Sequence, residues 1–222
     1  MIMSAHQPAY LPWLGYFDKI KRSDIFVFLD TVQFEKNSFT NRNKIKTPNG
    51  PLWLSIPVIK TDHFEKIMTE MPIDNKSHWQ RKHLSSIQMA YSKALHFKNL
   101  FPKLQELYAN SYDNIVDATW DHLMFWLDIL QIKTKIVKSS SLGISSKKSN
   151  LVFDLCKAVE ADYYISGALG KNYLESEKFA NAGIEIEFQD YKHPIYPQLN
   201  GNFIPNMGII DFAMNAPDYS II

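Results

Sequence analysis

One histidine stands where the chain is expected to turn from a strand into a helix. His6 follows a short apolar stretch, residues 2–5, and precedes Gln7, Tyr10 and a helix predicted from about residue 12. An imidazole at this point, together with the free amides of a helix start, suits contact with a phosphate. Capping of the turn through structural hydrogen bonds is the alternative. We take His6 as a catalytic candidate and Gln7 and Tyr10 as substrate-binding candidates.

A second histidine lies in the C-terminal part of the chain. His193 begins the stretch His-Pro-Ile-Tyr-Pro-Gln, which also supplies Tyr196 and Gln198. Histidine titrates near neutral pH, so His193 can act as a general acid or base. An extended strap with structural hydrogen bonds is the alternative. Asp211, in an apolar stretch, is a further catalytic candidate, and a buried carboxylate there would also need a partner such as a helix N-cap or a salt bridge.

A basic segment, residues 33–46, carries several cations and almost no counter-charge. Arginine offers phosphate or carboxylate a bidentate fork, and lysine offers a point charge. The whole chain has a net charge of only +1, so anion binding has to depend on a local cluster. A solvated surface loop is the alternative for this segment. The candidate binding residues here and just before it are Asp30, Gln33, Lys36, Asn41, Arg42 and Lys44.

A glycine-containing segment, Ser-Gly-Ala-Leu-Gly-Lys, stands between a predicted strand and a predicted helix. It departs from the Walker pattern at Ile165 and at Asn172, where Gly and Ser or Thr would be required. Ser166, Gly167 and Gly170 are therefore expected either to present amides to an anionic ligand or to form a simple glycine turn.

The composition is that of a folded globular protein. The chain has 222 residues, of which 45% are hydrophobic and 21% charged, which excludes a disordered chain and suits one large domain. The single cysteine, Cys156, excludes an internal disulfide and fits a reducing compartment. No apolar stretch has the length of a membrane span or the form of a secretory leader. We expect a cytoplasmic protein without membrane insertion or nucleic-acid partner, with a homo-oligomer left open.

The predicted elements that position these residues indicate an α/β fold. Continuous apolar runs alternate with helical periodicity, which is typical of a mainly parallel sheet with flanking helices. In such sheets ligands bind beyond the carboxyl ends of the strands, where most of the candidate residues stand. Strands are predicted at residues 2–5, 24–30, 133–138, 163–166 and 184–188, and helices at 12–22, 150–160 and 173–182.

Two further segments interrupt or follow this frame. Residues 52–58 and 67–73 are expected to form a hairpin, and a helical block at about 74–131 is predicted to contain helices at 77–91, 102–110 and 114–130. The tail, residues 190–222, has weak periodicity. We therefore predict a single α/β domain over residues 1–222, Rossmann-like or nucleotidyltransferase-like, with an inserted helical block and a wrapping tail. The histidines show no metal-ligand spacing, and no metal site is predicted.

Several motifs together resemble the WbqC-like family, and the likeness runs nearly end to end. The motifs that carry it are His-Gln-Pro-Ala-Tyr-Leu-Pro-Trp-Leu-Gly-Tyr-Phe from His6, Asn-Arg-Asn from Asn41, Trp-Leu at Trp53, Ser-Gly at Ser166 with Gly170 and Tyr173, and His-Pro-x-Tyr at His193 with Gln198. The resemblance implies a role in bacterial O-antigen and other surface-polysaccharide synthesis, and it suggests glycine transfer. It also adds Tyr173 to the substrate-binding candidates.

We therefore expect an enzyme that transfers a small acyl or aminoacyl group, such as glycine, to an amino sugar carried as a nucleotide-sugar. Because an amide does not form from a free carboxylate in water, activation by ATP with Mg²⁺ is the natural route, although the cofactor stays undetermined. A fold-level analogy to adenylyl-transferring enzymes favours nucleotide binding. His6 would stabilise charge on phosphate, and His193 or Asp211 would accept the amine proton. A non-catalytic nucleotide-sugar-binding or scaffolding protein is the alternative.

Overall fold

The computed structural model describes residues 1–35, 38–59 and 66–221. Its internal contacts divide the chain into two compact units. The first unit comprises residues 1–8, 15–32 and 132–192, and the second comprises residues 9–14, 33–131 and 193–222. The predicted helical insertion and most of the predicted tail thus belong to the second unit.

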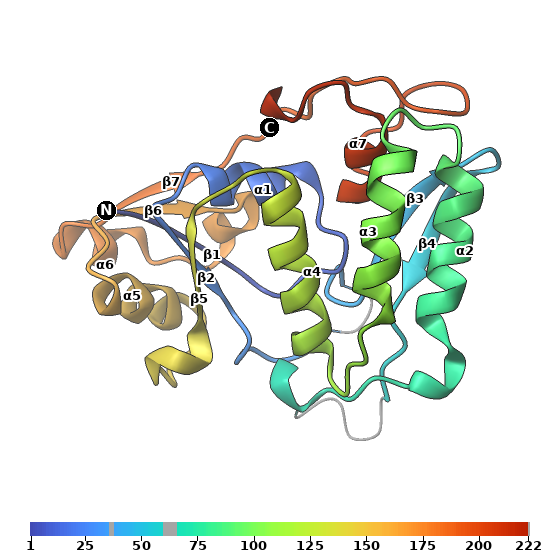
Figure 1. Cartoon of the computed structure of the whole chain (residues 1–222). Coiled ribbons are helices and arrows are strands. Elements are labelled where there is room, and N and C mark those ends of the chain that lie inside the picture. The colour runs from blue at the N-terminus through green and yellow to red at the C-terminus, as the bar shows by residue number, and fades with distance from the viewer. Residues whose placement is uncertain (36–37, 60–65, 222) are drawn as a thin grey trace. The chain divides into compact units, whose positions relative to one another are not determined.

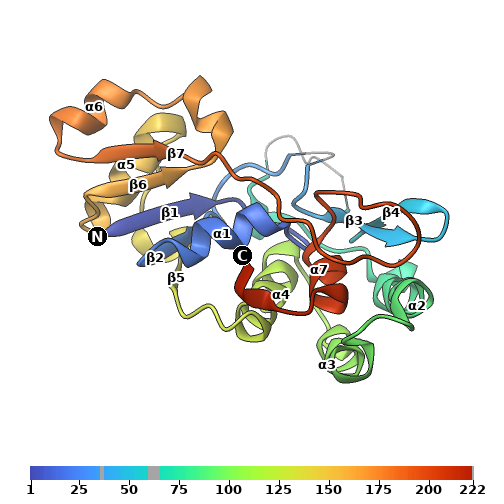
Figure 2. The ribbon, with the colours of Figure 1, turned by 90° about the horizontal axis from the view of Figure 1, so that it is seen from above.

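The first unit is built on a parallel sheet of five strands in the order β5-β2-β1-β6-β7 (Figure 1). Helix α1 (Leu14–Lys21) covers one face, and helices α5 (Lys148–Ala158) and α6 (Ser176–Asn181) cover the other, as Figures 1 and 2 show. The strands are β1 (Ile2–His6), β2 (Ile25–Phe28), β5 (Lys135–Lys138), β6 (Tyr163–Ser166) and β7 (Glu185–Phe188). The predicted α/β fold with a mainly parallel sheet is confirmed.

Alternation along β1 decides which side chains reach each face of this sheet. Met3 and Ala5 pack into the apolar core that contains Cys156. Ser4 and His6 point to the other face, where Ser4 Oγ donates to the Lys19 carbonyl of α1 at 3.3 Å. The cysteine is therefore core filling, and the histidine at the strand end faces α1.

In the residues that the structure describes, the second unit contains the antiparallel hairpin β3 (Arg42–Thr47) and β4 (Gly50–Ser55) and four α-helices. Of the predicted hairpin of residues 52–58 and 67–73, only an isolated antiparallel bridge between Val58 and Ile73 is present, because β4 pairs with β3 instead. The turn signal lies in Asn49 and Gly50, where Gly50 adopts a φ of 100° that favours glycine. The helices are α2 (Trp79–Tyr91), α3 (Phe97–Ala109), α4 (Ile115–Ile129) and α7 (Ile209–Asn215).

Helix α3 packs against both α2 and α4, so the predicted helical block is present. Helix α3 begins five residues before its predicted start at residue 102, so Pro102 lies inside the helix. Helix α7 was not predicted, because all seven of its residues are buried and a short run buried on every side shows no 3.6-residue periodicity. No helix in the described ranges is long and apolar enough to cross a membrane.

Gly208 holds the start of α7 against two other segments of the second unit. Its amide donates to the Lys44 carbonyl at 2.9 Å, and a Cβ at this position would lie 2.9 Å from the Leu11 carbonyl oxygen. We expect Gly208→Ala to lower the free energy of unfolding by about 1–3 kcal/mol in urea denaturation, because backbone atoms cannot yield as side chains do. Gly167→Ala is the control, since a Cβ there meets nothing within 4 Å. Equal effects of the two substitutions would contradict this account.

Candidate functional site

The strand order of the first unit changes direction between β1 and β6. The chain builds β2 and then β5 on one side of β1, and β6 and then β7 on the other side. Ligands of open parallel sheets bind at such a switch point, beyond the carboxyl ends of the strands. Strands β1 and β6 are neighbours in the sheet. His6 and Gln7, at the end of β1, therefore lie at the same edge as Ser166 and Gly167, at the end of β6.

His6 is a neutral imidazole in this setting. Burial, and next the charge of Lys19, lower its pKa to about 3, while the bond to the Gln7 carbonyl acts in the opposite sense. His6 Nδ1 donates to that carbonyl at 2.9 Å, so Nε2 is the basic nitrogen. The ring also packs edge-on against Tyr16, with centroids 4.9 Å apart. Protonation of His6 is disfavoured in this environment, so both its expected role of stabilising phosphate charge and the acceptance of a proton at Nε2 require a nearby anion that raises the pKa again.

Lys19 is a group near His6 that the sequence analysis missed. Its side chain is buried beneath β1, and its Nζ donates to the carbonyl of Ala5 at 2.9 Å. Burial lowers its pKa to about 7. The available signal was spacing, because Lys19 stands three residues after Tyr16 and therefore shares a helix face with this buried ring.

Asp30 ties two loops of the sheet edge together. Its Oδ1 accepts from the Ser139 hydroxyl and from the Ser140 amide, both at 2.8 Å, and its Oδ2 accepts from the Ser140 hydroxyl at 2.6 Å. The carboxylate is buried. These bonds join the loop after β2 to the turn after β5, an arrangement that favours a positioning role over direct contact with an anionic ligand.

The loop after β6 is a tight turn over the end of that strand. Ser166 Oγ donates to the Gly167 carbonyl at 3.0 Å, and the Gly170 amide donates to the same carbonyl at 2.9 Å. A Cβ on Gly170 would lie 1.9 Å from Ser166 Oγ, so the serine is packed directly beneath the glycine. Tyr173, at the end of the turn, remains 47% exposed and so can meet a ligand.

The basic segment belongs to the second unit, and its cations alternate along a strand instead of lying in a loop. Arg42 and Lys44 point to the face of the hairpin that carries Trp53, and both stand over the Trp53 ring, at 4.5 and 5.0 Å from its centroid. Asn41 extends the hairpin, since its Nδ2 donates to the Ile56 carbonyl at 2.8 Å. Gln33 is exposed and forms an isolated bridge with Ile67. Lys36 lies outside the described residues.

The tail residues predicted from sequence converge on one carboxylate. Asp211 is buried and accepts hydrogen bonds from the Tyr196 hydroxyl at 2.9 Å, from Gln198 Nε2 at 2.7 Å and from the Tyr91 hydroxyl at 2.9 Å. Burial raises its pKa, and the three donors act against that rise. A carboxylate with three protein donors is typical of a structural core group.

His193 lies beside this cluster. Its ring packs against Tyr196 and Phe203, with centroids 6.0 and 5.8 Å away, and its Nδ1 donates to the Pro194 carbonyl at 2.8 Å. Partial burial lowers its pKa from the usual value, and the charge of Asp211 counteracts this. Of the two proton acceptors expected in the tail, the neutral imidazole is the chemically better suited.

Tyr10 lies in a buried cluster of aromatic and histidine side chains in the second unit. Its hydroxyl meets His83 Nδ1 at 2.8 Å and also bonds the Tyr108 hydroxyl. His122 packs against both tyrosines, with ring centroids 5.3 and 4.9 Å away, and in the described part of the chain neither of its nitrogens has a hydrogen-bond partner. Tyr10 is fully buried, an arrangement that favours core packing over substrate contact.

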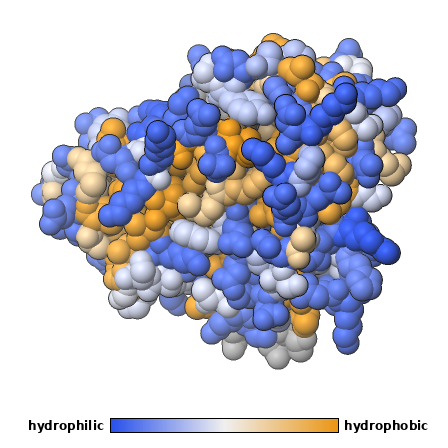
Figure 3. Space-filling view, in the orientation of Figure 1, coloured by the Kyte–Doolittle hydropathy of each residue, from blue (hydrophilic) through white to orange (hydrophobic). Residues whose placement is uncertain are grey.

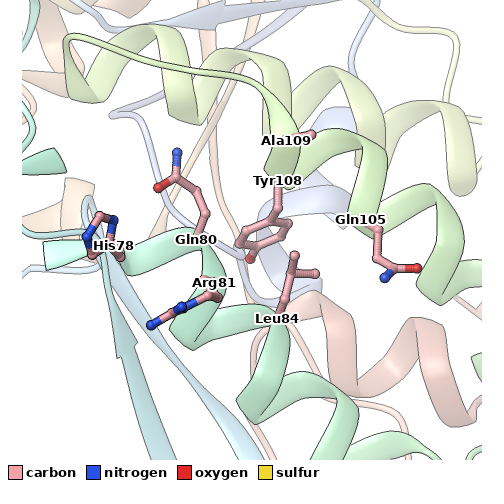
Figure 4. A pocket seen from close by; sticks show the side chains of 7 residues that line it. All are labelled: His78, Gln80, Arg81, Leu84, Gln105, Tyr108 and Ala109. Carbon is pink, nitrogen blue, oxygen red and sulfur yellow. The ribbon is translucent and has the colours of Figure 1, made fainter. Parts of the chain in front are cut away.

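A pocket of about 440 Å³ lies between α2 and α3 (Figure 4). Figure 4 shows the Tyr108 ring near its middle, among side chains of both helices, and Figure 3 shows mainly hydrophilic residues over the lower right of the surface, where α2 begins. The residues that line it are His78, Gln80, Arg81, Leu84, Gln105, Tyr108 and Ala109. None of these was predicted as a site residue. The Tyr108 hydroxyl also bonds the hydroxyl of the buried Tyr10.

The buried histidines make the stability of the protein depend on pH. Burial lowers the pKa of His122 to about 3 and that of His83 to about 4, whereas a histidine side chain in the unfolded chain has a pKa near 6.5. The unfolded state therefore binds more protons between these values, and the free energy of unfolding falls as pH drops below 6.5, by about 1.4 kcal/mol per pH unit for each histidine. We expect His122→Phe to reduce this slope between pH 4 and 6 in urea titrations. His78→Gln, at an exposed position, should keep the wild-type slope, and an unchanged slope in His122→Phe would contradict the assignment.

Asp211 allows a direct test of a structural role. Asp211→Asn turns an acceptor oxygen into a donor facing other donors, so we expect the free energy of unfolding to fall by about 2–4 kcal/mol. Asp113→Asn, at an exposed carboxylate of the same unit, should change it by less than about 0.5 kcal/mol. A stable Asp211→Asn protein would argue against the bonding described here.

No three His, Cys, Asp or Glu side chains lie together as a metal site within residues 1–35, 38–59 and 66–221.

A family model described as the WbqC-like protein family matches residues 7–221. A protein of Mycobacterium tuberculosis (strain ATCC 25618 / H37Rv), named "Uncharacterized protein Rv1507c", is 31% identical over 219 residues, which cover 96% of this chain and 94% of that protein. No solved structure matches. Because the family model matches nearly the whole chain, including residues of both compact units, the chain belongs to the WbqC-like protein family.

Proposed function

We propose that this protein transfers a small acyl or aminoacyl group, such as glycine, to an amino sugar in bacterial surface-polysaccharide synthesis. The observation that carries the proposal is the strand order of the first unit, with its switch point between β1 and β6. Doubly wound sheets of this order bind nucleotides at that point. A nucleotide there would lie against Gln7 and the Ser166–Gly170 turn.

The chemistry requires activation of the carboxylate. The carboxylate oxygen attacks the α-phosphorus of ATP, pyrophosphate leaves, and an acyl adenylate forms. The amine of the sugar then attacks the acyl carbon, AMP leaves, and the amine loses a proton. Backbone amides of the turn after β6 are suited to the adenylate phosphate.

The proton has to pass to a neutral base. His6 offers Nε2, because its Nδ1 donates to the Gln7 carbonyl. A phosphate anion bound beside the ring would raise its lowered pKa and so favour this proton transfer. His193 offers a neutral ring in the second unit. Asp211 is less suited, since its two oxygens already accept three hydrogen bonds. We assign the base to His6 and keep His193 as the second candidate.

His6→Asn separates catalysis from folding, because the asparagine amide can still donate to the Gln7 carbonyl. We expect it to lower turnover by about 100-fold or more and to leave the melting temperature nearly unchanged. His6→Ala should lose turnover to the same extent. Ser141→Ala, an exposed serine after β5, is the control with wild-type turnover. A large loss of stability in both His6 variants would mark the histidine as structural.

The assay combines thermal-shift screening against ATP, nucleotide-sugars and glycine with mass spectrometry of every stabilising mixture. An acylated or glycylated amino sugar, formed with AMP release, supports the proposal. Stabilisation by a nucleotide-sugar without any product favours a non-catalytic binding or scaffolding protein. Stabilisation by none of these compounds counts against both functions.

A further inference from the structure

Three segments that are far apart in sequence place aromatic rings in one row on the second unit. The Trp13 and Phe39 ring centroids are 5.5 Å apart, and those of Phe39 and Trp53 are 6.0 Å apart. Phe39 is 44% exposed and Trp53 is 41% exposed. Single exposed apolar side chains are ordinary, but adjoining exposed rings form a patch of the kind that marks binding surfaces. We call these three residues the aromatic row.

Backbone and side-chain hydrogen bonds within the second unit hold the row in place. The Tyr10 amide donates to the backbone carbonyl of Phe39 at 3.1 Å, which fixes the backbone that carries the Phe39 ring. Asn43 Nδ2 donates to the Leu11 carbonyl at 2.6 Å, and this bond joins the chain before Trp13 to strand β3. The rings therefore stand on a fixed framework, which lowers the cost of ordering them when a ligand binds.

Positive charge adjoins one end of the row. Arg42 and Lys44 alternate along β3, and Lys44 lies directly opposite Trp53 in the hairpin register. The guanidinium carbon of Arg42 lies 4.5 Å from the centroid of the Trp53 ring, so its planar charge is held beside that ring. Neither β3 nor β4 contains an acidic residue. The hairpin face thus combines flat apolar rings with a local surplus of positive charge.

We propose that the aromatic row, with Arg42 and Lys44, binds a small ligand that joins a flat ring face to a phosphate. The ring of the ligand would stack on Phe39 and Trp53, and its phosphate would meet the two cations. A nucleobase and a sugar ring share this chemistry, and the test distinguishes them. The choice of phosphate as the anion rests on the proposed function, whereas binding itself requires no turnover.

Isothermal titration with four probes tests the site on the full chain. The probes are uridine monophosphate and N-acetylglucosamine 1-phosphate, each with its counterpart that lacks phosphate. We expect Trp53→Ala to weaken binding of whichever phosphorylated probe binds more tightly by about tenfold, and we expect Trp53→Phe to weaken that binding less. Arg42→Gln and Lys44→Gln should each weaken it by about tenfold and leave the weak binding of the counterpart unchanged. The preferred phosphate identifies the ring as nucleobase or sugar.

Leu52→Ala is the matched control, because Leu52 is an equally exposed apolar residue of β4 that points to the opposite hairpin face. It should keep wild-type affinity. Absence of binding by all probes, or affinities that Trp53→Ala or both cation variants leave unchanged, would overturn the inference. If the wild-type protein binds the probes through the aromatic row but shows no turnover, only the proposed reaction is refuted. If Trp53→Ala keeps both wild-type turnover and wild-type affinity for the probes, only the binding role of the aromatic row is refuted.

Discussion

The central position of β1 is the constraint on which the first unit depends. This strand forms parallel ladders with β2 on one side and β6 on the other. Backbone hydrogen bonds have to be satisfied on both edges, so the strand is buried and its end has a fixed place in the sheet. Every group that follows β1 or β6 is thereby brought to the same edge, at the point where the strand order reverses.

Burial then decides the chemical state of the groups at that edge. His6 and Lys19 share an environment that disfavours positive charge, since burial lowers the pKa of both. The lysine ammonium keeps a carbonyl partner at Ala5, and the imidazole keeps one at Gln7. A sheet edge that offers a neutral base and backbone amides differs from one that offers cations, and it suits proton acceptance beside a phosphate more than charge neutralisation of it.

The second unit separates its polar groups by strand alternation and by burial. Lys46 is drawn inward, where its Nζ donates to the Asn202 carbonyl at 2.6 Å, while Arg42 and Lys44 on the same hairpin face stay near Trp53. The carboxylate of Asp211 is closed off by its donors. Charges that look alike in sequence therefore divide into a structural set within the core and a set beside exposed rings.

Some features follow from local pattern alone and others do not. Apolar runs alternating with helical periodicity were enough to predict the parallel sheet and the helical block, and the position of His6 after the first strand was readable because a strand end is a local property. The pairing of β3 with β4, the burial of Tyr10 and the convergence of Tyr196, Gln198 and Asp211 were not readable, since each depends on contacts between distant segments. Only the tertiary structure decides which polar side chain loses its water, and that loss sets its charge and its partners.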